Sequence, residues 1–556
     1  MTGDNATDQL IFVPLGGTGE IGMNLNLYGY GPPGLRRWLM IDLGIGFTGS
    51  DFPGTDIMMP DPKFIEDRRD RLDGIVLTHA HEDHLGAVPD LWPRLRCPVY
   101  ATRFTLAVLR RKLAECGLED LVPHIEVPLG GRFHVGPFAL ELVTLTHSIP
   151  EPNGVVIRTP AGTVFHTGDW KLDPDPVVGP VTDEEALKRL QTETVLAMVC
   201  DSTNVFESKT SGSEGALRGP LTEIIGRCTR GVAVTCFATN VARLKTITRA
   251  AAAAGREVAL VGASLKRISA AARECGYLDD IRPFVDEADV GDFPRDKMVM
   301  ICTGSQGEPR AALARMASGC HPGSALEAGD TVIFSSRVIP GNEAAIGRLQ
   351  NTLVRAGVEI ITQRHALVHV SGHPARDELA HMYGLVRPRA SIPVHGELRH
   401  LKEHAELARA CRVPEAIVAE NGDVIRIAPG PVRIEDSVPV GRLTREGNRL
   451  ASAGGDLVRE RNKALYNGAA VMTVVLNGQR QPKTEPQLST IGLLENDDES
   501  ARERIRRDVW NAIDDMPEKS YNNDDAVREA IRLAVRRAFR ELTGKKPLTH
   551  VHLVRV

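Results

Sequence analysis

Seven short apolar runs in this chain end in a histidine or a carboxylate, and this repeated ending constrains the fold more than any other feature of the sequence. The runs are Met40-Ile41-Asp42, Val76-Leu77-Thr78-His79, Leu145-Thr146-His147, His166-Thr167-Gly168-Asp169, Val199-Cys200-Asp201, Leu367-Val368-His369 and Pro393-Val394-His395. Eight of the 17 histidines lie on or just after such ends. Strands that present ligands from their ends are a rigid way to build a metal site. The sequence therefore predicts one site assembled from several strands.

The spacing of apolar residues changes along the chain. Up to about residue 205, short apolar runs such as Leu10–Pro14 and Leu196–Cys200 are separated by Gly and Pro, and one clear helix is expected at Thr102–Cys116. This pattern predicts mainly antiparallel sheets with a few helices outside. From Gly231–Phe237 and Val241–Ala254 onward, strands and helices alternate. That alternation is typical of a parallel, doubly wound sheet.

The first pattern returns near residue 366, so the alternating block is predicted to be an insertion within the first domain. Strands are expected at Ala366–Val370, Ala390–Val394 and Ile417–Ala419. Glycines near residue 450 favour a linker before a small α+β domain. The predicted fold is α/β with α+β, divided into 1–205 and 366–440 for the first domain, 206–365 for the insertion, 441–460 for the linker and 461–556 for the C-terminal domain.

Composition favours a soluble protein of a reducing compartment. The 556 residues carry a formal net charge of -5, so the phosphates of an anionic substrate would have to be met by local donors and metal. The nine cysteines are scattered without a Cys-x-x-Cys pair, which argues against a disulfide framework or a cysteine zinc site. The first residues show no signal peptide, and no stretch approaches the ~20 apolar residues of a membrane span. We expect a cytoplasmic protein with no membrane partner.

The segment His79-Ala80-His81-Glu82-Asp83-His84 is the strongest single candidate for chemistry. It follows the apolar run Gly74–Leu77 and holds three histidines and one aspartate within six residues. A lone histidine in a turn is usually solvated, but this density of ligand types predicts half of a metal site. Imidazole and carboxylate ligands with an open position are typical of catalytic zinc. Two ions ~3.5–4 Å apart can clamp both oxygens of an in-line phosphoryl displacement.

This segment resembles the His-x-His-x-Asp-His signature of the metallo-β-lactamase superfamily. The inserted block is similar to the β-CASP insertion of the branch of that superfamily that acts on nucleic acids. The further matching motifs are Asp42, His147 in Thr-His-Ser-Ile-Pro, Asp169 in Thr-Gly-Asp-Trp-Lys, Asp201 in Asp-Ser-Thr-Asn, His373 in His-Val-Ser-Gly-His and His395 in Pro-Val-His-Gly-Glu.

Three glycine-containing segments resemble the bacterial ribonuclease J family in particular. They are Gly16–Gly22, Thr303–Pro309 and Ile339–Glu343. The similarity runs from residue 10 to about residue 430, and the C-terminal part is similar in size and layout only. It implies a metallo-β-lactamase αββα sandwich with an inserted doubly wound β-CASP domain and a small C-terminal α+β domain.

The resemblance also implies a role for each residue of the site. It implies two zinc ions per subunit, and manganese suits the same ligands. The ligands would be His79, His81 and His147 on the first ion, Asp83, His84 and His395 on the second, and Asp169 between them. Asp42 would orient ligands from behind. Asp201 and His373 would form the acid–base pair, with Asp201 as proton donor and His373 as acceptor.

Two positions depart from the family pattern. Ala80 stands where glycine is common, and Glu151-Pro152 stands where Asp-Ser is usual. Neither position is a ligand. The second departure lies close to His147 in the sequence, so it is expected to reshape the rim of the site and to affect substrate preference there.

The loop His369-Val370-Ser371-Gly372-His373 is a candidate phosphate cradle. Gly372 allows close approach of the backbone, and Ser371 and His373 add donors. Taken alone, such a loop is more often an ordinary turn. Its place between two ligand-bearing strands, together with the resemblance, favours substrate binding by all five residues.

Other motifs are less specific. Thr303–Pro309, before a helix expected near Glu308, suits an anion site or a capped turn equally well. Gly16–Gly22 is expected to be a close-packed turn under the metal site, because no ribose-binding acid follows it as in a dinucleotide site. Two arginine-rich helices at Glu499–Asp515 and Asp524–Leu542 carry interleaved acids, so a solvated face is favoured over RNA binding.

Hydrolysis of RNA phosphodiesters is the function that the sequence favours. The resemblance implies 5′-to-3′ exonuclease action on 5′-monophosphorylated RNA, endonuclease action as well, and roles in mRNA decay and rRNA maturation. It also implies a homodimer or homotetramer and a place in an RNA-decay complex. The alternatives are a DNA nuclease of the same branch, a hydrolase of thioesters, lactones or β-lactams, and a non-catalytic scaffold. The complete ligand set argues against the scaffold.

Overall fold

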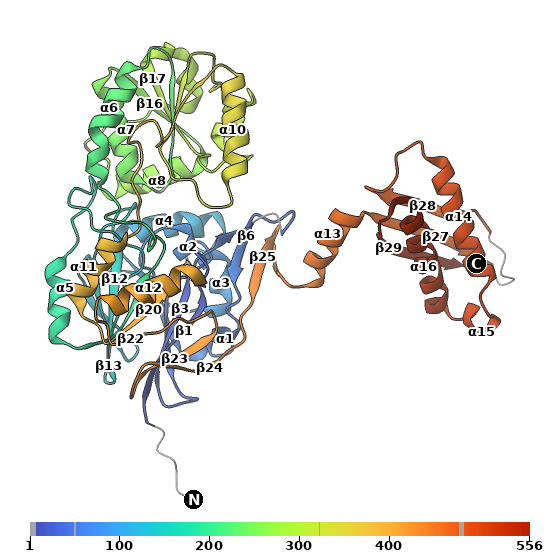
Figure 1. The fold of residues 1–556 in the computed structure, drawn as a ribbon, viewed down its shortest axis with the longest axis horizontal. Helices are drawn as coiled ribbons and strands as arrows, with labels where there is room; N and C mark the ends of the chain where they lie inside the picture. Colours follow the sequence, from blue (N-terminus) through green and yellow to red (C-terminus); the bar gives the residue numbers. More distant parts are fainter. Residues whose placement is uncertain (1–6, 49–51, 322, 478–482) are drawn as a thin grey trace, which may run out of the picture. The chain divides into compact units, whose positions relative to one another are not determined.

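The computed structural model describes residues 7–48, 52–321, 323–477 and 483–556 (Figure 1). The chain divides into two compact units. The larger unit consists of Met1–Gly46 and Met59–Gly441, and the smaller of Phe47–Met58 and Arg442–Val556. All the candidate site residues belong to the larger unit.

An eight-stranded sheet forms one layer of the larger unit. Its strands, in spatial order, are β24 (Arg433–Ser437), β23 (Asp423–Ala428), β1 (Gln9–Gly16), β3 (Leu25–Gly31), β4 (Arg37–Ile41), β7 (Leu72–Val76), β8 (Val99–Ala101) and β9 (His124–Glu126). Neighbours are antiparallel from β24 to β4 and parallel from β4 to β9.

A seven-stranded sheet forms the second layer. Its strands, in spatial order, are β10 (Arg132–Val135), β11 (Phe138–Thr144), β12 (Asn153–Thr159), β13 (Gly162–His166), β14 (Val195–Asp201), β20 (Ala390–Val394) and β22 (Glu415–Ala416). Neighbours are antiparallel from β10 to β13 and parallel from β13 to β22.

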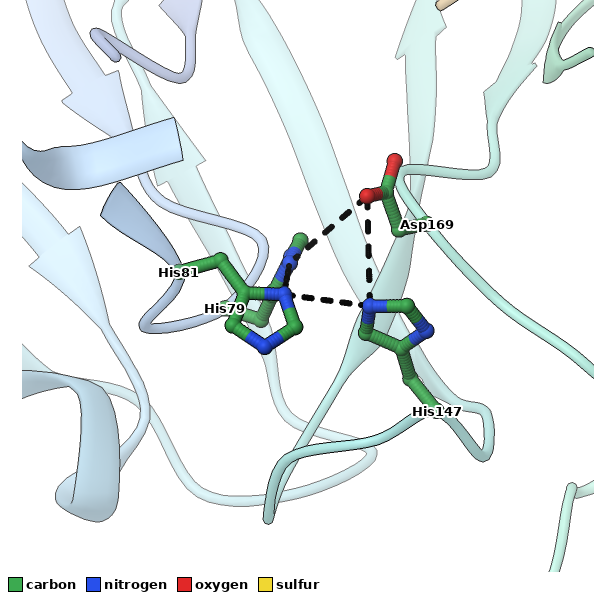
Figure 2. A group of neighbouring side chains, drawn as sticks. All are labelled: His79, His81, His147 and Asp169. Atoms are coloured by element: carbon green, nitrogen blue, oxygen red, sulfur yellow. Dashed lines mark hydrogen bonds and ion pairs between the residues drawn. The ribbon is translucent and has the colours of Figure 1, made fainter. Parts of the chain in front are cut away.

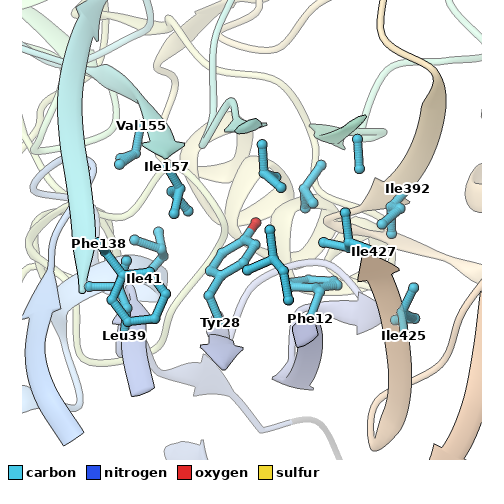
Figure 3. Packing of buried hydrophobic residues seen from close by; sticks show 14 of the residues in the cluster. Phe12, Tyr28, Leu39, Ile41, Phe138, Val155, Ile157, Ile392, Ile425 and Ile427 are labelled. Carbon is cyan, nitrogen blue, oxygen red and sulfur yellow. The ribbon is translucent and has the colours of Figure 1, made fainter. Parts of the chain in front are cut away.

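The two sheets pack face to face through alternate residues of their strands. Phe12 of β1 and Tyr28 of β3 share one buried cluster with Val155 and Ile157 of β12 (Figure 3). Side chains alternate between the faces of a strand, so Ile11, which is also buried, points to the opposite face. Both faces of the first sheet are therefore covered. Burial of this apolar surface is the main force holding the layers together.

Helices occupy the connections and the outer side of the second sheet. The expectation of mainly antiparallel sheets is wrong, because both sheets are mixed. Parallel neighbours need crossovers. The crossover from β7 to β8 contains two helices that were not predicted from the sequence, because one is very short and the other contains Pro93. The helices of the sandwich include α2 (Glu82–Leu85), α3 (Val88–Leu95), α4 (Arg103–Glu115), α5 (Glu184–Arg189), α11 (Arg376–Val386) and α12 (Leu398–Ala410). Leu187, Met382 and Leu407, from the last three, share a core with Phe165 of the second sheet.

The alternating block forms a separate parallel sheet, which confirms the predicted insertion. Its strands lie in the order β16 (Glu257–Val261), β17 (Met298–Cys302), β15 (Val232–Thr235), β18 (Thr331–Phe334) and β19 (Glu359–Ile361). The helices of the block are α6 (Arg218–Arg227), α7 (Val241–Ala253), α8 (Ala263–Glu274), α9 (Ala312–Ala317) and α10 (Glu343–Arg355). The block leaves the second sheet after β14 and returns before β20, and these two strands are hydrogen-bonded neighbours.

Three local expectations differ from the structure. Residues 366–370, all within the described part of the chain, form no strand, because the carbonyl oxygen of Val368 accepts from Ser335 and Arg243 instead of from a neighbouring strand. Residues 417–419 follow β22 and are not part of it. Helix α9 begins at Ala312, later than the expected start near Glu308.

The smaller unit contains a three-stranded sheet in the order β28 (Gln487–Ile491), β27 (Ala469–Leu476) and β29 (Leu548–Arg555). Helices α14 (Glu499–Asp514) and α16 (Asp524–Thr543) bury one face each in a core with β27. The Asn523 side chain caps the start of α16, and Gly544 in the left-handed conformation ends it. The interval expected as a linker holds the hairpin β25 (Arg442–Glu446) and β26 (Arg449–Ser452) and the start of α13 (Asp456–Asn467). Across the described ranges, no helix has the length and apolar character needed to cross a membrane.

Candidate metal centre

The segment His79–His84 connects the end of β7 to helix α2. Its backbone is held by the neighbouring extended chain, since Leu43 N donates to His84 O at 2.7 Å and Asn24 N donates to Asp83 O at 2.9 Å. Gly44 allows this approach, because a Cβ there would lie 1.7 Å from Asp83 O. The close contact fixes the direction in which the side chains of the segment leave the backbone.

Three imidazoles and one carboxylate form the first group of donors (Figure 2). His81 Nδ1 lies 3.0 Å from His79 Nε2 and 3.1 Å from His147 Nε2. Asp169 Oδ2 lies 4.0 Å from His79 Nε2 and 3.9 Å from His147 Nε2. The four side chains come from three separate connections at the ends of β7, β11 and β13. Their nitrogens point at one another, as ligands of a common ion do.

The second group shares Asp169 with the first and adds Asp83, His84 and His395. His84 Nε2 lies 3.1 Å from Asp169 Oδ2 and 3.7 Å from Asp83 Oδ2. His395 Nε2 lies 3.1 Å from Asp83 Oδ2. In each group the ligand atoms all lie within 4.8 Å of one another. The structure therefore brings together all seven residues expected as ligands.

Most of these imidazoles are oriented by a partner on the nitrogen that faces away from the cluster. His84 Nδ1 lies 2.6 Å from Asp42 Oδ2, His79 Nδ1 lies 2.9 Å from Thr78 Oγ1, and His395 Nδ1 lies 2.8 Å from Thr203 Oγ1. His147 Nδ1 contacts the carbonyl oxygen of Gly372. Such contacts fix the tautomer and leave Nε2 free for a metal, which is the usual arrangement of metal-binding histidines.

Electrostatics in the first group suit a metal ion. Burial lowers the pKa of His79 and His147 well below the usual value, and that of His81 to about 4. These three imidazoles are therefore neutral at physiological pH, which is the form that binds metals.

The second group shows the opposite shifts. Burial alone would lower the pKa of His84 and His395, but the surrounding carboxylates raise the pKa of His84 well above its usual value and that of His395 to about 10. Burial would raise the pKa of Asp83 and Asp169, yet the neighbouring histidines hold both below their usual range. The carboxylates of this group thus stabilise positive charge close to them. A divalent cation would supply that charge in place of protons on the histidines.

Asp201 and His373 meet beside the two groups. Asp201 Oδ2 lies 2.8 Å from His373 Nδ1, and Asp201 Oδ1 accepts from Thr203 N at 2.8 Å. His373 Nδ1 also lies 3.8 Å from Asp169 Oδ2. Burial opposes both shifts, but the two groups together lower the pKa of Asp201 and raise that of His373.

Four family models match the chain. They are a ribonuclease J β-CASP domain at 229–353, a β-lactamase superfamily domain at 37–196, a Zn-dependent metallo-hydrolase RNA specificity domain at 357–423 and a ribonuclease J C-terminal domain at 456–556.

Curated relatives match over nearly the full length. Ribonuclease J of Sinorhizobium meliloti is 45% identical over 551 residues, which cover 99% of this chain and 98% of that protein. The chain belongs to the ribonuclease J family. Ribonuclease J of Mycolicibacterium smegmatis is 38% identical, covering 96% of this chain and 95% of the relative, and that of Thermus thermophilus is 34% identical, covering 97% and 94%.

The ribonuclease J fold predicted from the sequence is thereby confirmed, with its metallo-β-lactamase domain, inserted β-CASP domain and C-terminal domain. A crystal structure of a protein of unknown function from Enterococcus faecalis V583 is also similar. It has a TM-score of 0.51 at 16% identity and covers 75% of this chain and 100% of that one. This likeness shows a shared fold only.

The loop 369–373 of this ribonuclease J family member is only partly joined to the metal centre. The last two residues of the loop lie at the centre. Gly372 contacts His147, and His373 is hydrogen-bonded to Asp201. A Cβ on Gly372 would lie 2.9 Å from His147 Cε1, so the approach depends on glycine. Val370 is buried.

His369 does not join the metal donors. Its Nδ1 lies 3.5 Å from the buried guanidinium of Arg243. His166, at the end of β13, also lies apart from the donors, with its Nδ1 3.0 Å from Tyr28 Oη in the core between the sheets. A strand end therefore indicates the region of the site but does not decide which histidines face it.

Three polar residues near the site were not found from the sequence. Asn24 Nδ2 lies 3.1 Å from His84 Nε2, and Thr203 bridges Asp201 and His395. Asn204 Nδ2 donates to Ser371 Oγ at 2.7 Å and to His373 O at 3.0 Å. Thr203 and Asn204 belong to the Asp-Ser-Thr-Asn motif, so that motif could have indicated both residues as part of the site. No local pattern marks Asn24.

The glycine segments of the ribonuclease J pattern shape the backbone around the centre. The carbonyl oxygen of Gly17 accepts from His395 N at 2.6 Å, and a Cβ on Gly22 would lie 3.4 Å from Asp83 Cβ. This confirms the expected close-packed turn under the site. Gln306, in the segment Thr303–Pro309, accepts from Ile339 N at 2.9 Å and so joins two of the family segments in one interlocked turn.

Proposed function

We propose that this chain is a zinc-dependent ribonuclease that hydrolyses RNA phosphodiester bonds with two metal ions per subunit, manganese suiting the same ligands. The proposed ligands are His79, His81 and His147 for the first ion, Asp83, His84 and His395 for the second, and Asp169 for both. The observation that carries the proposal is the convergence of six buried or half-buried donors around a seventh, Asp169, in a chain of the ribonuclease J family. Metal ions bound there would lower the pKa of water and neutralise charge on phosphoryl oxygens.

Asp201 and His373 are proposed as the acid–base pair. Their hydrogen bond of 2.8 Å holds one proton beside the shared donor Asp169. Cleavage requires a proton for the leaving 3′ oxygen, and a positioned pair of this kind can deliver it. Thr203 N and Oγ1 both donate to Asp201 Oδ1, so the carboxylate cannot rotate away from His373.

The loop 369–373 is proposed to hold the phosphate of the nucleotide next to the cut. Support comes from the position of Gly372 and His373 at the metal centre and from Asn204, which clamps Ser371 and His373 together. His369 would contribute from the side of the inserted domain, near Arg243. A loop that accommodates a terminal phosphate favours RNA with a 5′-monophosphate.

The wider role is proposed from the family. It comprises 5′-to-3′ exonuclease and endonuclease action in mRNA decay and rRNA maturation, in the cytoplasm. A homodimer or homotetramer and a place in an RNA-decay complex are proposed on the same ground.

A cleavage assay on 5′-labelled RNA with monophosphate or triphosphate ends tests the function. We expect single-nucleotide products from the monophosphorylated RNA, and His81→Ala or Asp83→Ala should abolish them while the circular dichroism spectrum stays unchanged. Glu82→Ala is the matched control, because Glu82 lies in the same segment but its carboxylate pairs with Lys112. Unchanged RNA cleavage by the ligand variants would overturn the assignment. Faster cleavage of DNA oligomers or of nitrocefin would favour the alternative hydrolases.

A further inference from the structure

The inserted domain touches the metallo-β-lactamase domain at a second place, away from the two chain crossings. Here α8 of the insertion lies against α4. Arg110 and Arg111 of α4 both pair with Glu274 at the end of α8, and Arg267 of α8 pairs with Glu115. These ion pairs are largely exposed, and such pairs contribute little to the strength of a contact.

A buried carboxylate makes the stronger connection at this place. Glu151 is only 6% exposed. Its Oε1 accepts from the hydroxyl of Tyr277, just after α8, at 2.7 Å, and its Oε2 accepts from Phe104 N at 2.8 Å. The rings of Tyr277 and Phe104 also meet edge to face, with centroids 6.0 Å apart. Glu151 therefore ties the inserted domain to the start of α4.

Glu151 belongs to the same connection between β11 and β12 that presents His147. Its φ is +56°, and its carbonyl oxygen accepts from Asn153 Nδ2 at 2.6 Å. Asn153 N in turn donates to Thr78 O at 3.1 Å, next to His79. The connection is therefore stiff and is tied to both sides of the first donor group.

The inserted domain thus contacts this connection through Tyr277 and Glu151. Gly372, which follows the inserted domain in the chain, contacts the same connection at His147. We infer that Tyr277 is a positioning residue that, through Glu151, seats the inserted domain on the connection carrying His147 and so sets the path of RNA over the metal centre.

This inference rests on the proposed ribonuclease function, and Tyr277→Phe tests it because only the hydroxyl is lost. We expect KM for a short 5′-monophosphorylated RNA to rise by about fivefold to tenfold, the change that follows from losing one hydrogen bond of ordinary strength. Hydrolysis of bis(p-nitrophenyl) phosphate, a diester too small to span the two domains, should stay within about twofold. Tyr30→Phe is the matched control, because the Tyr30 hydroxyl bonds only an exposed carboxylate remote in sequence from the site.

A double variant separates positioning from general disturbance. If Tyr277 acts through Glu151, adding Tyr277→Phe to Glu151→Met, which has no oxygen to accept from Tyr277, should change KM much less than it does in the wild type. Independent effects of the two substitutions, a wild-type KM in Tyr277→Phe, or an equal loss on the small diester would each overturn the inference.

Hydrogen–deuterium exchange provides a readout that needs no activity. Amides of residues 145–153 should exchange faster in Tyr277→Phe than in the wild type and in Tyr30→Phe, because the seat of the connection is loosened. If the wild type does not cleave RNA, the proposed function is wrong. Hydrogen–deuterium exchange then still tests whether Tyr277 holds the inserted domain on this connection. Unchanged exchange in 145–153 would overturn the inference.

Discussion

Asp42→Asn is the sharpest test of how the second metal site is built. Asp42 is fully buried, and its carboxylate meets only donors: Thr78 N on Oδ1 at 2.8 Å, and Thr78 Oγ1 and His84 Nδ1 on Oδ2 at 2.8 and 2.6 Å. Its φ is +65°, a conformation that asparagine tolerates well. The substitution therefore changes the hydrogen bonding with little cost to the backbone.

The amide has no good orientation in this pocket. If its NH₂ group takes the place of Oδ1, it faces the N–H of Thr78. If it takes the place of Oδ2, His84 must accept on Nδ1 and carry its proton on Nε2, the atom that points into the second donor group. Loss of such an orienting partner typically lowers metal affinity about tenfold to a hundredfold. In free energy this is about 1.4–2.7 kcal/mol of binding.

Zinc titration against a competing chelating dye measures this affinity. We expect one of the two proposed metal sites to bind zinc about tenfold to a hundredfold more weakly, and RNA cleavage to recover at high zinc concentration. Asp67→Asn is the control, because it removes the same charge from an exposed carboxylate paired with Lys63. Two sites of wild-type affinity in Asp42→Asn would refute the view that Asp42 sets the tautomer of His84.

Three further measurements test other parts of the structure. Arg243→Met should lower the free energy of unfolding by about 3–5 kcal/mol in denaturant titrations, because it leaves the buried Glu214 without its partner; Arg243→Met with Glu214→Met should recover more than half of that loss, and no recovery would contradict the pairing argument. Burial holds the pKa of His404, between Ser202 and Tyr383, at about 4 against a usual 6.5, so the neutral form stabilises the fold above pH 6.5 and this contribution is lost as the pH falls toward 4. The stability difference between wild type and His404→Gln should accordingly shrink from pH 7 to pH 4, by up to about 3 kcal/mol, and a constant difference would speak against a neutral His404. Removal of metal with a chelator should lower Tm, and zinc at a hundredfold excess over its Kd should restore about 2.7 kcal/mol; an unchanged Tm would show that the centre holds no metal.

The inserted domain was the part of the fold that the sequence predicted best. The strand Glu257–Val261 and the strand Met298–Cys302 match the structure at both ends. Both are buried on two faces in a parallel sheet, so they read as continuous apolar runs. The run at Ala366–Val370 is also mostly apolar but forms no strand. Its backbone partners, Arg243 and Ser335, are distant in sequence, so no local pattern distinguishes the two cases.

The candidate site was accessible for a different reason. Strand ends carry its donors, and a strand end is recognisable where an apolar run meets a polar ligand type. What sequence did not reveal is the layer behind the donors. Asn24 contacts Asp83 across 59 positions, and Thr203 contacts His395 across 192. The Glu151–Tyr277 contact likewise spans 126 positions and arises only when the inserted domain packs.

The neighbouring strands β14 and β20 have a consequence for biosynthesis. Val199 lies opposite Ile392 in the sheet although the whole insertion is translated between them. The histidines of the first donor group leave the ribosome long before His395, which follows β20. A nascent chain, or one truncated before residue 395, therefore lacks a ligand of the second group however well its first domain folds. The complete set of donors therefore exists only after translation has passed residue 395, beyond the end of the inserted domain.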